Sequence, residues 1–334
     1  VSIPRGFFYF VKEPQFFFVY FFTFFHLRAE RTLKALIHAW LLVGLANIVW
    51  VLTQLFIVGT KGEYGTSAFA EWGVFPTGAF FLLLFIFLFN WWLYSFWRKG
   101  SWQKEYLYLA AVLSIIIGIL GSLSKTIFIG FWFALFVSML LYFFTEKTLK
   151  NAFFVTLFFA GVSLFTLSSY FFLIRPNLGV NAGRLITDLT PLKIVDSAYH
   201  TRVEPIIIPQ FQVAISRPIL EKIFGNGKGV ILLTTESHNQ YLRNFVETGI
   251  AGSIAFLWLV FAIFRSVWKG FIQKNEKVAN CLSAGVIVAT LTMLFMSFIV
   301  DAFSTVKPNM VYWFFIGLTM AVLANYEREE EKRN

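Results

Sequence analysis

The sequence TTESHNQYLRNFVETGIAGSIAFLWLV, residues 234 to 260, changes from polar to almost wholly apolar along its length. Its first half carries a histidine, an arginine and a glutamate, and its second half is an apolar run that continues to Phe264. Such a run can cross the ~30 Å hydrocarbon core of a bilayer as a helix. The stretch therefore predicts a membrane helix with a group of polar residues at its entrance.

The composition of the whole chain extends this interpretation. Of 334 residues, 58% are hydrophobic and only 14% are charged, whereas a soluble domain is about one quarter charged. Lipid offers the backbone no hydrogen-bond partners, so the apolar runs must be helical. We expect an all-α polytopic membrane protein with about nine transmembrane helices. The predicted segments are 16–27, 33–58, 74–97, 106–121, 127–144, 152–174, 245–264, 278–300 and 310–323.

The distribution of Lys and Arg predicts the orientation. One set of short connections carries 15 of the 28 basic residues and the opposite set carries 5, so the first set is predicted to be cytoplasmic. The other 8 lie between residues 175 and 244, on the predicted outer face. We therefore expect N-terminal transmembrane helices in 1–174, with further helices upstream, an extracytoplasmic loop with short helices in 175–244, and C-terminal transmembrane helices with a cytoplasmic tail in 245–334.

The start of the helix after this loop is a candidate site. Ser237 followed by Gln240 has the spacing of a capping box, which predicts a helix from His238 that runs on through Gly249 into the membrane. Backbone N–H groups at such a start bind phosphate, and their positive field keeps a histidine neutral and able to accept a proton. The alternative is that His238 and Asn239 only close the end of a helix at the membrane surface.

The charged residues nearby allow a second prediction. Arg243 and Glu247 are four apart and can form an ion pair on one helix face. The basic residues of the loop and of the GSLSKT turn can converge on an anionic group, because the guanidinium fork suits diphosphate oxygens. For any one of them, plain solvation or snorkelling is the alternative. The candidates are Lys125, Arg184, Arg202, Arg217, Lys228 and Arg243.

Two further patterns concern metals and nucleotides. No histidine pair or acidic cluster indicates a metal site, and Asp301 is expected to be a cap or an ion-pair partner. The glycine-rich FGNGKG, residues 224–229, lacks the residues of a Walker loop and is interpreted as a turn or an anion-binding backbone nest.

These motifs resemble the O-antigen ligase and polymerase superfamily of bacterial membrane glycosyltransferases. The family pattern is His, then Asn, Ser or Gln, nine residues, Gly, two residues, and Gly, Thr or Tyr, and residues 238–252 fit it without a gap. Arg202, Pro218 and the GNG at 225–227 resemble the arrangement upstream of that pattern, and Lys125 stands where relatives have an arginine. The likeness in layout covers residues 37–323.

The resemblance implies a GT-C-like fold and transfer of a glycan from undecaprenyl diphosphate to a sugar hydroxyl, on the outer face of the bacterial inner membrane. His238 would be the catalytic base, supported by Asn239 and Glu247, and neither metal nor cofactor is implied. The expected partners are the lipid-linked donor, a lipid A core or glycan acceptor and membrane lipids, but no nucleic acid. The residues expected to bind diphosphate are Arg202, Arg217, Lys125, Arg243 and Arg184.

Two alternatives remain open at this point. A polymerase of the same superfamily would extend the lipid-linked glycan instead of ligating it. A transporter or flippase for lipid-linked oligosaccharide would need polar residues along a path through the spans.

Overall fold

The computed structural model describes residues 14–26, 30–58, 74–99, 102–122, 124–145, 149–169, 199–227, 239–273, 277–304 and 306–333. Within these ranges every regular element is a helix and no strand occurs. The α-helices are α2 (Pro14–His26), α3 (Glu30–Thr53), α4 (Val74–Lys99), α5 (Trp102–Gly121), α6 (Lys125–Thr145), α7 (Leu149–Ser168), α10 (Ile208–Ser216), α11 (Ile219–Phe224), α12 (Gln240–Gln273), α13 (Lys277–Met296) and α14 (Val306–Arg333). Three short elements are η1 (Gln54–Val58), η6 (Tyr199–Ile207) and η8 (Ala302–Ser304).

The nine apolar segments predicted from the sequence are helical where the structure describes them, except that the segment 278–300 leaves the helix after Met296. Among the described residues, five helices are long and apolar enough to cross a membrane, namely those within α4, α6, α12, α13 and α14. Apolar parts of α3, α5 and α7 are shorter, at 10–17 residues. The prediction of an all-helical membrane protein is therefore confirmed for the described residues, while nine crossings and a GT-C-like arrangement stay predictions.

Helix α4 forms the centre of the bundle. Every residue from Thr77 to Asn90 is buried, because α4 is apolar on all sides and α5, α6, α13 and α14 pack around it. Aromatic rings fill the contacts: the ring centroids of Phe85 and Phe131 lie 4.8 Å apart, and those of Phe87 and Phe315 lie 3.7 Å apart. Such a helix, without a polar face, is stable only inside other helices.

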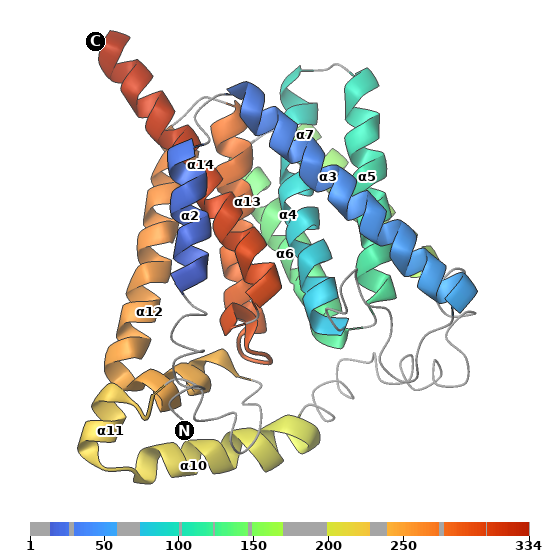
Figure 1. Ribbon diagram of the computed structural model, residues 1–334. Helices are drawn as coiled ribbons and strands as arrows, with labels where there is room; N and C mark the ends of the chain where they lie inside the picture. Colours follow the sequence, from blue (N-terminus) through green and yellow to red (C-terminus); the bar gives the residue numbers. More distant parts are fainter. Residues whose placement is uncertain are drawn as a thin grey trace.

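Figure 1 shows α10 and α11 across one end of the bundle, at the start of α12, and the C-terminus beyond the opposite end. Residues 199–227 of the predicted outer loop thus contain short helices. Helix α12 begins at Gln240, within the segment 175–244 and two residues after the predicted start at His238. Helix α14 continues to Arg333, so the polar C-terminal tail is helical in its described part.

Candidate functional site

The first turn of α12 is capped by a side chain that the sequence analysis had placed inside the helix. Asn239 Oδ1 accepts the N–H of Leu242 at 2.9 Å, and Asn239 Nδ2 donates to the carbonyl of Phe298 at 3.1 Å. Asn is among the best N-cap residues for this reason. The prediction that the helix starts at His238 is wrong, because Asn239 precedes the first helical residue. Ser237 and His238 lie outside the described residues.

The backbone N–H groups of this turn are already bound within the protein. The amide of Gln240 donates to the carbonyl of Ser297 at 2.9 Å, and that of Arg243 donates to the carbonyl of Asn239 at 3.0 Å. With the amide of Leu242 capped, three of the groups expected to bind phosphate have other acceptors. The helix start docks on the end of α13, so the amide of Gln240 is used within the protein, while the predicted phosphate amides of Ser237 and His238 lie outside the described residues.

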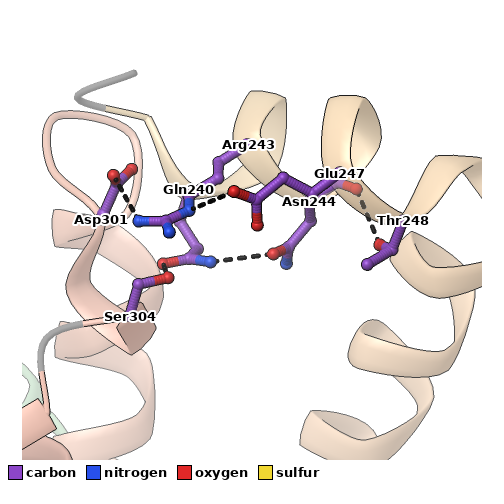
Figure 2. A network of polar contacts seen from close by, with 7 residues as sticks. All are labelled: Gln240, Arg243, Asn244, Glu247, Thr248, Asp301 and Ser304. Carbon is purple, nitrogen blue, oxygen red and sulfur yellow. Dashed lines mark hydrogen bonds and ion pairs between the residues drawn. The ribbon is translucent and has the colours of Figure 1, made fainter. Parts of the chain in front are cut away.

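A buried ion triad follows in the second turn, as Figure 2 shows. Arg243 Nε lies 3.2 Å from Glu247 Oε1, and Arg243 Nη1 lies 3.1 Å from Asp301 Oδ2. The side chain of Arg243 is 10% exposed and that of Glu247 is 0% exposed. Both the predicted pair of Arg243 with Glu247 and the interpretation of Asp301 as an ion-pair partner are confirmed. The triad connects α12 to the loop between α13 and α14.

Next to the triad, three polar side chains of α12 lie four residues apart on one face, and Ser304 of η8 joins them. Gln240 Nε2 donates to Asn244 Oδ1 at 2.9 Å, Ser304 Oγ donates to Gln240 Oε1 at 3.1 Å, and Thr248 Oγ1 donates to the carbonyl of Asn244 at 2.7 Å. We call Gln240, Asn244, Thr248 and Ser304 the polar row. The sequence analysis missed it, although the four-residue spacing was a visible signal.

The polar row forms one part of the wall of a cavity of about 270 Å³ between α2, α12, η8 and α14. The rest of the wall is almost entirely apolar and aromatic, and none of the described lining residues is charged. Representative lining residues are Phe16, Phe256, Leu259, Ile263, Tyr312 and Trp313. Cavities with a mostly apolar wall and a few polar groups are typical binding sites for ligands that have an apolar part.

Helix α12 does not run straight through Gly249. This residue has φ 68° and ψ −167°, which interrupts the helix. The GNG segment docks on the interruption: the amide of Asn226 donates to the carbonyl of Val246 at 3.1 Å, and that of Gly227 to the carbonyl of Glu247 at 2.9 Å. Carbonyl groups at the end of a helical stretch need such partners from outside the helix.

The glycines of both motifs are required by this contact. A Cβ atom on Gly225 would meet the backbone of Glu247, and one on Gly249 would meet the carbonyl group of Ile223. The turn predicted for residues 224–229 is therefore confirmed in its described part, whereas the alternative of an anion-binding nest is wrong for the two amides that α12 occupies. Gly252 has no such neighbour from another helix and lines the cavity.

The other predicted cations lie on separate elements. Arg217 follows the last residue of α10 and directs Nη1 toward the carbonyl of Val246, at 3.5 Å, so it lies close to the α12 interruption. Arg202 belongs to η6, whereas Lys125 begins α6, which packs on α4 and α13. Arg184 and Lys228 lie outside the described residues. The structure therefore brings Arg217 to the same part of α12 as Arg243, and it places Lys125 on another helix.

The described residues contain no group of three or more His, Cys, Asp or Glu that could hold a metal ion. No protein-family model matches this chain, and no curated protein matches it.

Proposed function

We propose that this protein is a membrane glycosyltransferase of the O-antigen ligase type, which moves a glycan from undecaprenyl diphosphate to a sugar hydroxyl on the outer face of the bacterial inner membrane. The observation that carries the proposal is the cavity between α2, α12 and α14. Its apolar wall suits a prenyl chain, and its polar row begins at Gln240, two residues after His238. We propose that a lipid tail held there has its head group at the start of α12; His238 itself lies outside the described residues.

The reaction makes two demands on the protein. The acceptor hydroxyl must lose its proton as its oxygen attacks the anomeric carbon, and His238 is the proposed base. The bond from that carbon to the diphosphate oxygen breaks, and the electron pair leaves with the diphosphate, whose charge needs compensation.

The described cations differ in their fitness for that compensation. Arg217 is half-buried beside α12, and Arg202 lies in η6, which leads directly into α10. We therefore propose these two as the diphosphate ligands. Arg243 is already compensated by two carboxylates and acts mainly by holding α12 to the loop before α14. A polymerase would use the same donor chemistry and would differ only in the acceptor.

The test is glycan transfer in membranes that contain the donor and either lipid A core or a glycan acceptor. We expect His238→Ala to lower the rate by about 10²- to 10⁴-fold, the usual contribution of a general base. The matched control is His200→Ala, because His200 lies on η6, is 62% exposed and pairs with Glu204 at 3.0 Å. A folded and inserted His238→Ala protein with full transfer would refute the proposal. The acceptor that is consumed decides between ligase and polymerase.

A further inference from the structure

A second surface, away from the cavity, lies on α10 and α11. Seven large apolar side chains of these two short helices are between 38% and 68% exposed. They are Ile208, Phe211, Val213, Ile215, Ile219, Leu220 and Phe224. The three charged residues of the same segment, Arg217, Glu221 and Lys222, are only partly exposed. On a surface that faces water, charged side chains are exposed and large apolar side chains are mostly buried. The surface of α10 and α11 therefore suits an apolar neighbour.

Three of the four exposed apolar residues of α10 form a stripe, and the fourth, Val213, lies on another face. Ile208, Phe211 and Ile215 recur at intervals of three and four residues and therefore share one face of the helix. A different face carries Ala214, which is 3% exposed and packs against Leu242 and Val246 of α12. Helix α10 is thus held to the bundle by one face and presents an apolar stripe on another.

The position of the two helices identifies the neighbour. Figure 1 shows α10 running across the end of the bundle, at the start of α12 and roughly perpendicular to it. Helix α12 itself exposes Ile250, Ile254 and Leu257 along its length, a stripe that faces lipid if α12 crosses the membrane. This stripe starts just beyond Gly249, where the end of α11 docks. The exposed side chains of α11 therefore continue the lipid-facing surface toward the end of the bundle.

We infer that α10 and α11 lie in the outer leaflet, with the stripe of Ile208, Phe211 and Ile215 inserted at the boundary between head groups and acyl chains. Amphipathic helices that lie in the plane of the membrane use apolar faces of this kind. The GNG contact with α12 then holds the polar row at the same depth. A lipid reaches the cavity by lateral movement within the leaflet, without leaving it. This inference does not depend on the reaction proposed above.

The test measures the depth of single side chains in the full chain, reconstituted in phosphatidylethanolamine and phosphatidylglycerol vesicles. Cys281, the single cysteine, is replaced by alanine, and nitroxide labels are attached to cysteines at Phe211, Ile215 or Ser216. Collisions with oxygen, which concentrates in lipid, are compared with collisions with a water-soluble nickel complex. Ser216 is the matched control, because it is exposed on α10 but lies off the stripe.

We expect labels at positions 211 and 215 to have an oxygen-to-nickel ratio several-fold above that of position 216 and near that of a label at Ile254. Equal ratios at all three α10 positions, with free access for nickel, would place α10 in water and overturn the inference. Exclusion of both reagents from positions 211 and 215 would show a protein neighbour, such as a second copy, and would also overturn it.

A second measurement uses the unaltered chain. A photoactivated apolar carbene reagent dissolved in the bilayer should label the tryptic peptide 203–222 as strongly as the peptide that contains Ile254. A peptide 203–222 without label, alongside a labelled Ile254 peptide, would contradict the inference without any question of misfolded variants.

Discussion

Replacing Gly249 by alanine tests whether the GNG contact holds α10 and α11 to the bundle. Gly249 has φ 68° and ψ −167°, a backbone region that is essentially restricted to glycine, so alanine there costs about 1–3 kcal/mol in strain. The new Cβ would also meet the carbonyl group of Ile223, so that α11 has to move. The movement breaks the two hydrogen bonds from Asn226 and Gly227. Each of these hydrogen bonds contributes about 0.5–1.5 kcal/mol. Together with the strain, their loss should lower the free energy of unfolding by about 2–6 kcal/mol.

Two other glycines separate the contributions. Gly227 has φ 91° but open space around a built Cβ, so Gly227→Ala adds strain without a clash. Gly161 lies inside α7 with open space and no unusual backbone, so Gly161→Ala should be neutral or stabilising, by up to about 1 kcal/mol. Each purified variant is heated in detergent, and the fraction that stays monodisperse on size exclusion gives an apparent Tm.

We expect the apparent Tm to fall in the order Gly161→Ala, wild type, Gly227→Ala and Gly249→Ala. A Gly249→Ala protein that melts with the wild type would refute the docking argument. Equal losses for Gly249→Ala and Gly227→Ala would show that strain alone matters and that the close approach of α11 does not.

Three further changes address the triad, the cap and the cavity. Arg243→Met leaves two carboxylates without their cation and should lower the free energy of unfolding by about 3–5 kcal/mol in a denaturant titration. Asp301→Asn should lower it less, because Glu247 still pairs with the arginine. Equal losses for the two variants would contradict the triad. Asn239→Ala should cost about 0.5–2 kcal/mol in the same titration, and Asn239→Ser should keep most of the stability, since serine is an equally good cap. Ala255→Trp fills the cavity and should lower transfer at least tenfold at unchanged Tm. Ala251→Trp should not, because Ala251 lies one turn away and does not line the cavity; equal activity in both would show that the cavity is not used in the reaction.

Much of the fold could be predicted because hydrophobicity is a local property. An apolar run such as that of α4 forms a helix whatever its neighbours are. Neither lipid nor apolar side chains offer hydrogen-bond partners to the backbone, so its N–H and C=O groups must bind one another. The pair of Arg243 with Glu247 was predictable for a similar reason, because residues four apart meet on any helix. The start of α12 was predicted two residues too early, because Ser237 and Asn239 are both residue types that cap helices. The side chain of Asn239 caps the helix, and contacts with the end of α13 hold this turn in place.

Local sequence patterns predicted an apolar, helical chain, the approximate positions of its long helices and the side chains that share a helix face. They did not predict that Asp301 completes the triad, that the GNG segment fills the interruption at Gly249, or that the polar row of α12 opens on a cavity. The difference lies in the range of the interactions. Helix formation depends on neighbours within one turn, whereas each of these contacts joins segments that are distant in the chain and meet only once the helices have packed.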